Sequence, residues 1–198
     1  MDLIIKKETV DDYFAVENLT REAFFNIYMS GCDEHLVVRN LRNTKSYINE
    51  LSLVAFFNNE LVGHIMLTRA RVEKDEVLCL GPISVLPKFQ SKGIGSKLMK
   101  DAIKSAKNMG FKAIILLGNP DYYSKFGFKK CKDFEISLEN GQCFDALQIL
   151  HLSENNNIKG RFIYDRAFVA DEKELEEYEK LFPYKEKTEP KIKIEIQK

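Results

Sequence analysis

Residues 83–100 read ISVLPKFQSKGIGSKLMK and place two glycines at the start of a segment with helical periodicity. Glycine in a helix interior costs about 1 kcal/mol relative to alanine, so a pair at this point needs a physical reason. Without side chains at Gly93 and Gly95, the backbone N–H groups of the turn can approach an anion closely, and the helix dipole adds partial positive charge. The stretch therefore predicts a phosphate-binding turn between a strand and a helix.

Three glycine-rich phosphate-binding patterns compete for this stretch. A P-loop needs Gly-Lys-Ser/Thr, but Gly95 is followed by Ser96-Lys97. A dinucleotide-binding fingerprint needs a third Gly or Ala where Leu98 stands. The third pattern is Gln/Arg-x-x-Gly-x-Gly after a strand that ends in Val-x-Pro. VLPKFQSKGIG matches it at Val85, Pro87, Gln90, Gly93 and Gly95. A tight turn that merely tolerates glycine is the alternative interpretation.

The periodicity around this stretch predicts a βαβ unit, with a strand over 77–87, a helix over 93–109 and a buried strand over 112–118. Further elements are expected on both sides: a strand at 3–8, helices at 9–25 and 34–42, a hairpin over 52–73 with its turn at Asn58-Asn59, a short helix in PDYYSKFGF and a strand in CFDALQILHL. The fold class is therefore α/β (α+β), with a mixed central sheet flanked by helices.

The chain of 198 residues and 22.9 kDa is long enough for one well-buried core. We expect a single domain over residues 1–170 and a short C-terminal extension over 171–198. The extension begins with a charged helix in DEKELEEYEKLF and ends with the strand-like alternation KIKIEI. Residues 191–197 are expected to dock on a sheet edge or an exposed patch, in the same chain or in a partner subunit; a disordered charged tail is the alternative.

Composition excludes several classes of protein. Lys plus Arg and Asp plus Glu both number 30, so the formal charge is zero and gives no field to recruit nucleic acid or an acidic membrane. The N-terminus lacks the apolar run of a signal peptide, and no apolar run approaches the length of a membrane span. We therefore expect a cytoplasmic protein that binds neither nucleic acid nor membranes.

The four cysteines lie far apart, without a Cys-x-x-Cys pair: Cys32, Cys79, Cys131 and Cys143. This spacing predicts reduced thiols that serve as packing residues. The three histidines do not supply ligands at the short spacing that a zinc site needs, so no metal is expected.

With these motifs, the chain resembles the GNAT superfamily of N-acetyltransferases over about residues 1–152. A second stretch, LLGNPDYYSKFGFKK, is similar to a later motif of that superfamily, with Asn119, Tyr123, Gly127 and Phe128 at the motif positions. LGNPDYYSKFGF, together with DEHLVVRNLR and LSLVAFFNNELVGHI, more narrowly resembles the bacterial subgroup of predicted small-molecule acetyltransferases.

The resemblance implies acetyl-CoA as cosubstrate, with its pyrophosphate on the glycine turn and its pantetheine arm beside the strand over 77–87. It assigns hydrogen bonds with that arm to the backbone of Ile83 and Val85, and polarisation of the thioester carbonyl to the Val85 N–H. Tyr123 would protonate the departing thiolate, whereas Tyr122 is expected to be a packing neighbour whose hydroxyl can be removed silently. The predicted cofactor-binding residues are Ile83, Ser84, Val85, Gln90, Ser91, Lys92, Gly93, Ile94, Gly95, Ser96, Asn119 and Tyr123.

A base is useful because an alkylammonium with a pKa near 10.4 is only about 0.04% deprotonated at pH 7. The candidates are Glu34, His35 and His64, of which Glu34 is assigned to the catalytic set. A helix N-terminal acid is the alternative role for Glu34, a core or sheet position is the alternative for His64, and a water relay would leave no trace in the sequence. Lys88 and Lys92 are expected either to contact phosphates or to be solvated surface.

The expected function is acetyl-CoA-dependent N-acetylation of a primary amine on a small molecule or of an exposed amino group, by direct attack on the thioester. The alternative is an acyl-CoA-binding sensor or interaction module without efficient turnover. The acceptor amine is expected to enter opposite CoA, between residues 24–35 and the final strands. A homodimer is left open.

Overall fold

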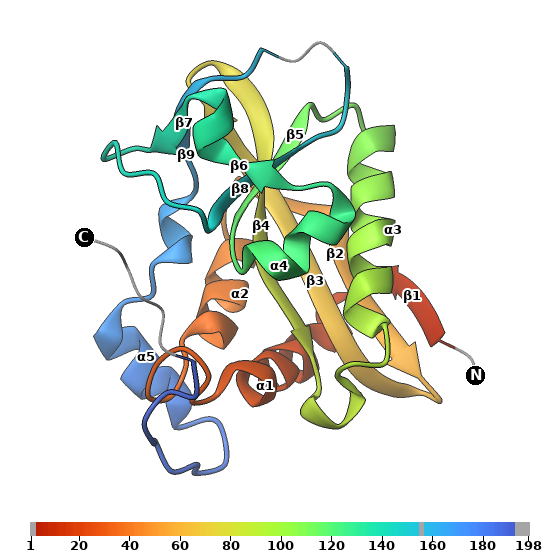
Figure 1. Ribbon diagram of the computed structural model, residues 1–198. Helices are drawn as coiled ribbons and strands as arrows, with labels where there is room; N and C mark the ends of the chain where they lie inside the picture. The colour runs from red at the N-terminus through yellow and green to blue at the C-terminus, as the bar shows by residue number, and fades with distance from the viewer. Residues whose placement is uncertain (1–2, 155–156, 193–198) are drawn as a thin grey trace.

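The computed structural model describes residues 3–154 and 157–192, and its strands form one nine-stranded mixed sheet (Figure 1). The strand order is β1-β2-β3-β4-β5-β8-β6, and β7 and β9 attach at the end of β3. The helices and strands are β1 (Leu3–Lys7), α1 (Tyr13–Phe24), α2 (Glu34–Arg42), β2 (Tyr47–Phe57), β3 (Glu60–Val72), β4 (Asp75–Val85), α3 (Ile94–Asn108), β5 (Ala113–Leu117), α4 (Pro120–Tyr123), β6 (Lys129–Lys130), β7 (Ile136–Leu138), β8 (Leu147–His151), β9 (Gly160–Ile163) and α5 (Glu172–Glu179). The predicted fold class is confirmed.

The predicted hairpin is formed by β2 and β3. Asn58 and Asn59 both have positive φ, +49° and +63°, as the two central residues of a tight hairpin turn require. The first strand of the hairpin begins at Tyr47, five residues before the predicted start at 52, because an irregularity between Tyr47 and Ser52 shifts the register. This irregularity conceals the alternation of buried and exposed residues on which the sequence-based boundary depended.

The predicted βαβ unit consists of β4, α3 and β5. β4 pairs in parallel with β5 at Leu78 and Cys79, opposite Ile114 and Ile115. From Leu80 to Val85, β3 is the only strand paired with β4 among the residues that the structure describes. The register of that pairing shifts beside Gly81-Pro82, where proline cannot donate a ladder hydrogen bond. The second half of β4 therefore has one edge free of strand partners.

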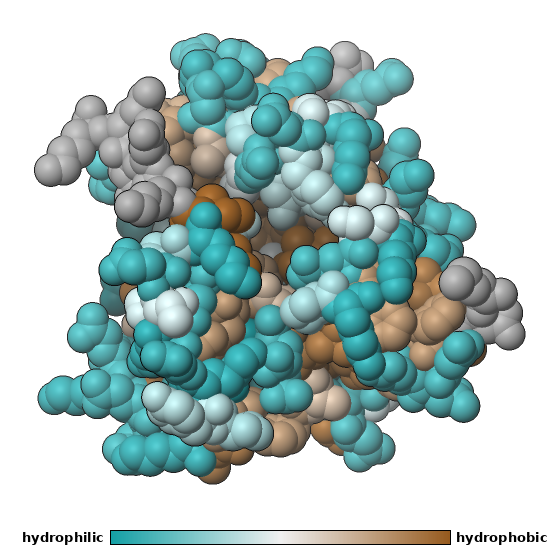
Figure 2. Space-filling view, turned by 60° about the horizontal axis from the view of Figure 1, so that its bottom comes forward, coloured by the Kyte–Doolittle hydropathy of each residue, from teal (hydrophilic) through white to brown (hydrophobic). Residues whose placement is uncertain are grey.

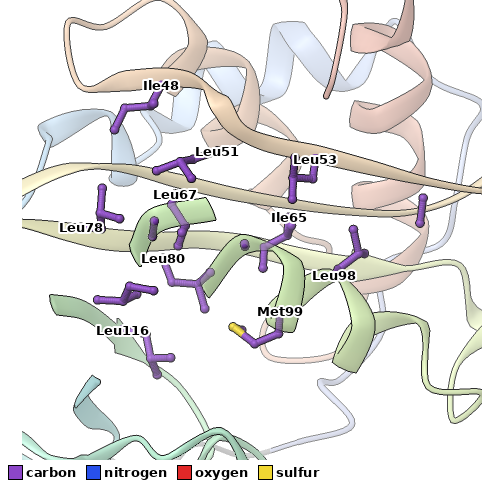
Figure 3. Close-up of a cluster of buried hydrophobic side chains, with 14 of the residues drawn as sticks. Ile48, Leu51, Leu53, Ile65, Leu67, Leu78, Leu80, Leu98, Met99 and Leu116 are labelled. Atoms are coloured by element: carbon purple, nitrogen blue, oxygen red, sulfur yellow. The ribbon is translucent and has the colours of Figure 1, made fainter. Parts of the chain in front are cut away.

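Helices cover both faces of the sheet. α3 packs Leu98, Met99 and Ala102 against inward-facing residues such as Ile65 and Leu67 (Figure 3). Met109, the last residue of the predicted helix, is 43% exposed and lies just beyond the end of α3 at Asn108.

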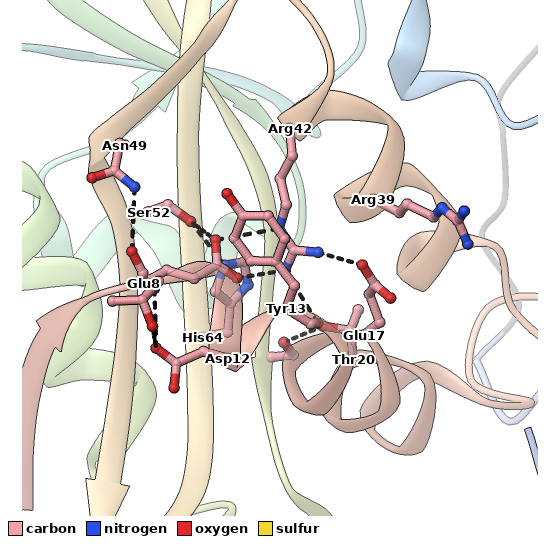
Figure 4. Close-up of polar contacts among 12 residues, drawn as sticks. Glu8, Asp12, Tyr13, Glu17, Thr20, Arg39, Arg42, Asn49, Ser52 and His64 are labelled. Atoms are coloured by element: carbon pink, nitrogen blue, oxygen red, sulfur yellow. Dashed lines mark hydrogen bonds and ion pairs between the residues drawn. The ribbon is translucent and has the colours of Figure 1, made fainter.

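The opposite face of the sheet is covered by α1 and α2, whose side chains pack on Val54 and Met66. This face also contains a buried polar cluster around Arg42, which is paired with Glu8 and Glu17 (Figure 4). The cluster joins β1, α1 and α2, and breaking one partner of such a buried pair would leave an uncompensated charge.

The C-terminal extension packs on α1 and α2. Tyr178 and Phe182 are 5% and 7% exposed and lie against Leu36. The guanidinium of Arg21 donates to both carboxylate oxygens of Glu179, at 2.8 to 3.1 Å. Thus the segment predicted as an extension beyond residue 170 contributes buried side chains to the packing of the domain.

Most of the predicted strand at 191–197 lies outside the described residues. Lys191 and Ile192 are described, and their N–H groups donate to the carbonyls of Asn26 and Ile27 at 3.0 and 2.8 Å. The first two residues of the predicted docking segment therefore do contact the same chain, at a loop and not at a sheet edge.

Cys32, Cys79 and Cys131 are buried, as expected of packing residues, whereas Cys143 is exposed. All four thiols are free. Within the described part of the chain, none of the helices combines the length and the apolar character needed to cross a membrane.

Candidate active site

The free edge of β4 presents the backbone of Ile83 and Val85. The N–H of Leu86 donates to the Val62 carbonyl at 3.0 Å, and backbone groups along an antiparallel strand alternate in direction. The N–H and C=O groups of Ile83 and Val85 consequently point away from β3, toward the unpaired edge. Their side chains turn toward the first turn of α3. Gln90 donates its side-chain amide to the Val85 carbonyl at 3.1 Å.

Ser84 is placed differently from its neighbours. Its side chain is 1% exposed, and its hydroxyl lies 2.9 Å from that of Thr20 on α1. The side chain is therefore on the α1 face of the sheet, which corrects the prediction that it binds cofactor. Alternation along the strand is the physical reason, because Ser84 must face opposite to Ile83 and Val85.

The turn from β4 to α3 is held by two residues with left-handed backbone, Ser91 at φ +59° and Gly93 at φ +83°. The first hydrogen bond of α3 runs from the Lys97 N–H to the Gly93 carbonyl at 3.0 Å. The N–H groups of Ile94 and Gly95 therefore have no acceptor within the helix, as at any helix N-terminus. The Ile94 side chain is buried in the core, so the backbone is the part of Ile94 that this turn presents.

The two glycines of the turn are required for different reasons. A Cβ at Gly93 would contact nothing within 4 Å, but φ of +83° would strain any residue with a side chain. Gly95 has ordinary helical backbone, and a Cβ there would lie 3.1 Å from the Tyr122 hydroxyl and 3.6 Å from Val85 Cγ2. Gly93 thus shapes the turn, and Gly95 allows a tyrosine to approach it.

The two lysines predicted near phosphates are both exposed. Lys88, just after β4, forms an ion pair at 2.6 Å with Glu60, the first residue of β3. The Lys92 ammonium lies 5.2 Å from the centre of the Phe89 ring. Both side chains are near the turn, and among the described residues only Lys88 is paired with a carboxylate.

Tyr123 is positioned by a glycine that sequence reasoning missed. A Cβ on Gly118 would lie 2.3 Å from the Tyr123 ring, so only glycine fits beneath it. Burial raises the pKa of the Tyr123 hydroxyl above its usual value, and the nearby hydroxyls of Tyr122 and Tyr28 add to the effect. Tyr123 is therefore protonated at neutral pH and can act as a hydrogen donor.

Tyr122 and Asn119 have structural partners at the same end of the site. Burial raises the pKa of Tyr122, while the Ser96 side chain opposes this shift. The Tyr122 hydroxyl lies against the first turn of α3, 3.1 Å from the position that a Cβ on Gly95 would take. That this hydroxyl can be removed silently stays a prediction. Asn119 caps α4 by accepting a hydrogen bond from the Asp121 N–H at 2.9 Å.

The three candidate bases lie in very different surroundings. Glu34, in the first turn of α2, is partly exposed, and burial raises the pKa of its carboxyl to about 7. His64 is fully buried and lies 3.2 Å from the Ser52 hydroxyl, and burial lowers its pKa to about 4 (Figure 4). His35 is also fully buried, with its pKa lowered to about 4 for the same reason. Only Glu34 combines access with a pKa suited to a base at neutral pH.

His35 belongs to a cluster with Cys32 and Glu179. Its Nδ1 lies 3.6 Å from the Cys32 sulfur and its Nε2 lies 2.9 Å from Glu179 Oε1. Burial raises the pKa of the Cys32 thiol and lowers that of His35. At neutral pH the thiol is therefore protonated and the imidazole is neutral, so the cluster does not generate a thiolate. Glu179 is the ion-pair partner of Arg21, whose positive charge opposes a cation at the same place. Cys32 and His35 are only three residues apart, but Glu179 is distant in sequence, so spacing could not group the three.

Between α1 and the β4–α3 turn there is a hollow of about 420 Å³. Its lining includes Phe25, Asn26, Gln90, Lys185 and Glu186. The end of the molecule shown in Figure 2 is visibly hollowed near its centre, with hydrophobic side chains inside. The hollow thus adjoins Gln90, which bonds to the Val85 carbonyl. Its far side is formed by residues near the C-terminus, Lys185, Glu186 and Lys191.

A strand with a free edge, a helix N-terminus with unpaired N–H groups and a partly buried phenol lie at one end of the sheet, an arrangement that suits an acyl-CoA-dependent acyltransferase. The sequence matches the Acetyltransferase (GNAT) family over residues 13–128, more than half of the chain. The protein therefore belongs to the GNAT acetyltransferase family.

Two curated relatives from Escherichia coli K12 are uncharacterized N-acetyltransferases. YjhQ is 35% identical over 99 residues, which are 48% of this chain and 55% of that protein, so the match spans about half of YjhQ. YhbS is 23% identical over 171 residues, which cover 84% of this chain and 98% of that protein.

Two solved structures share the fold. The crystal structure of Escherichia coli YhbS in complex with CoA superposes with a TM-score of 0.76 at 22% identity, covering 84% of this chain and 91% of that one. The structure of a Brucella melitensis GNAT acetyltransferase in complex with acetyl-CoA gives a TM-score of 0.72 at 29% identity, with coverages of 85% and 99%.

Proposed function

We propose that the protein transfers the acetyl group of acetyl-CoA to a primary amine of a small molecule or to an exposed amino group. The observation that carries this proposal is the free edge of β4 at Ile83 and Val85, which leads directly to the unpaired N–H groups at the start of α3. CoA in YhbS and acetyl-CoA in the Brucella melitensis protein support the same cosubstrate here.

Each part of the site has a chemical role in this reaction. The backbone at Ile83 and Val85 would hold the pantetheine arm as an additional strand, and N–H groups from residues 93–96 would bind the pyrophosphate. Gly93 and Ser91 supply the backbone shape, and Ser96 lies in the first turn of α3. Lys92, exposed beside this turn, would meet a phosphate, and Asn119 fixes the helix that carries Tyr123.

The transfer itself forms a carbon–nitrogen bond and breaks a carbon–sulfur bond. Glu34 takes a proton from the ammonium form of the acceptor, whose nitrogen lone pair then attacks the thioester carbonyl. The Val85 N–H stabilises the negative charge that develops on the carbonyl oxygen. As the carbon–sulfur bond breaks, the Tyr123 hydroxyl gives its proton to the sulfur, and the nitrogen releases its second proton to solvent. Solvent then returns a proton to the phenolate and takes the proton from Glu34. The products are an N-acetylated amine and CoA.

An acetyl-transfer screen tests the proposal. The purified chain would be supplied with acetyl-CoA and separate acceptors, namely phenethylamine, spermidine, amino acids and kanamycin, and free CoA thiol would be measured. Because Cys143 is exposed, each assay needs a control without amine, and the acetylated product should be confirmed by mass spectrometry. Tight CoA binding without acetylation of any amine would favour the alternative of an acyl-CoA-binding sensor.

A further inference from the structure

Residues 185–192, here called the C-terminal segment, lie along the loop that joins α1 to α2. Asn26 is the main point of attachment. Its side-chain amide donates to the Glu186 carbonyl at 3.0 Å, and its side-chain oxygen accepts from the Thr188 N–H at 3.2 Å. The Asn26 backbone carbonyl accepts from the Lys191 N–H at 3.0 Å. One residue of the loop therefore binds the segment at three points.

Asn26 also closes the loop on itself. Its N–H donates to the Gly31 carbonyl at 2.7 Å, and its side-chain oxygen accepts from the Gly31 N–H at 2.8 Å. Its φ of +58° is a left-handed conformation that asparagine tolerates better than most residues. Asn26 is 8% exposed, so these bonds are shielded from competing water. The shape of the loop and the attachment of the segment thus depend on the same side chain.

The loop and the segment border the candidate site together. At the tip of the loop, Tyr28 and Met29 are each 42% exposed, and the Tyr28 hydroxyl is close enough to Tyr123 to contribute to its raised pKa. The hollow beside Gln90 is bounded on its far side by the C-terminal segment. Lys185 in the segment forms an ion pair with Glu22 on α1 at 2.8 Å, and both residues line the hollow.

We infer that the C-terminal segment is a wall of the acceptor-binding site and that Asn26 is the positioning residue that holds it there. This inference rests on the proposed acetyl transfer. The glycine turn and the free edge of β4 lie on the cofactor side and make no hydrogen bond with the segment in the described structure. The segment therefore affects the acceptor and leaves CoA binding unchanged.

Two truncations test the inference. A chain ending at Tyr184 loses the segment but keeps the buried Phe182, and Tyr184 itself is 91% exposed. A chain ending at Ile192 keeps every hydrogen bond described above and is the matched control. Asn26→Gly is the point variant, because glycine accepts positive φ while losing both side-chain attachments.

For each chain, CoA affinity would be measured by calorimetry. The kcat and KM would be measured with phenethylamine, spermidine and kanamycin, and amide hydrogen exchange would be followed over residues 26–31. We expect the chain ending at Tyr184 to bind CoA within about twofold of the full chain while its KM for the accepted amine rises about tenfold, because the hydrogen bonds that hold the segment on Asn26 are lost. Amide exchange at 26–31 should become faster. Asn26→Gly should shift KM in the same direction by a smaller factor.

An unchanged KM for the accepted amine in the chain ending at Tyr184 would overturn the inference, as would an equal loss of CoA affinity, which indicates a general structural role. The same KM change in the chain ending at Ile192 would also overturn it. If the full chain binds CoA but acetylates none of the amines, the proposed function fails, and the unaltered full chain reveals this without any truncation.

Discussion

The cofactor side and the acceptor side of the candidate site are built in different ways. The cofactor side, residues 83–96, is one continuous stretch in which a strand, a turn and a helix start follow each other in sequence. The inferred acceptor side combines the loop at 26–31 with residues 185–192, more than 150 positions away. A continuous stretch needs only local geometry to form a site, whereas a discontinuous one depends on tertiary contacts that hold distant segments together.

This difference suggests that the two sides can be damaged separately. Changes in the cofactor stretch should affect CoA binding or the chemical step, because that stretch is assigned the backbone groups that bind the cosubstrate. Changes on the acceptor side should affect the amine or its deprotonation. The following predictions test that separation in order of decreasing effect.

Gly95→Val should give the largest effect. The branched Cβ would enter the space 3.1 Å from the Tyr122 hydroxyl and 3.6 Å from Val85, and would displace one side of the turn. We expect CoA affinity to fall at least about a hundredfold, since several charge-assisted hydrogen bonds are lost together. Lys97→Val puts the same residue on the exposed side of the same helix and should retain binding. Calorimetry with CoA on folded protein, verified by circular dichroism, measures the difference; equal affinities would contradict the role of the turn.

Tyr123→Phe should lower kcat by about a hundredfold, the usual contribution of a general acid. CoA affinity should barely change, because the ring stays against Phe128 and Gly118. Tyr184→Phe is the appropriate control, since that side chain is 91% exposed. Tyr122→Phe, which removes a hydroxyl that lies against the first turn of α3, should change kcat far less than Tyr123→Phe. Normal turnover by Tyr123→Phe at neutral pH would show that the sulfur is protonated by another donor.

Glu34→Gln should reduce kcat about tenfold at pH 8, less than the usual factor for a base because some acceptor amine binds already deprotonated. Since burial raises the pKa of Glu34 to about 7, the parent should lose activity as the pH falls through 7 and the carboxylate becomes protonated. The variant should lack that inflection. Glu76→Gln, an exposed residue paired with Arg69, is the control. An unchanged pH profile in Glu34→Gln would exclude Glu34 as the base.

Lys92→Ala should have the smallest effect, about a threefold loss of CoA affinity that fades at high salt, because an exposed charge contributes less than about 1 kcal/mol. Lys88→Ala should change less, since the Lys88 ammonium is already neutralised by Glu60. Calorimetry at two salt concentrations measures both. A larger loss for Lys88→Ala would show that its ion pair opens to receive a phosphate.

The success of sequence reasoning follows the same division. The motif VLPKFQSKGIG correctly predicted a strand, a turn and a helix because glycine and proline restrict backbone geometry locally. Ser84 was misjudged within this stretch, although strand alternation contains the signal that separates it from Ile83 and Val85. Gly118 was missed because its reason is the Tyr123 ring five residues later, a contact that spacing does not reveal.

The sequence by itself determined the order of the long helices and strands, the glycine turn and the tyrosine motif, since each depends on residues close together in the chain. The short strands β6, β7 and β9 were not predicted. Only the tertiary structure decided which candidate base is accessible, that His35 lies beside Cys32 and Glu179, and that Asn26 holds the C-terminal segment. Burial sets the pKa of Glu34 and of both buried histidines, and burial is created by segments far away in sequence. Local backbone preferences act before the chain is compact, whereas desolvation and long-range hydrogen bonds exist only once distant segments have packed together.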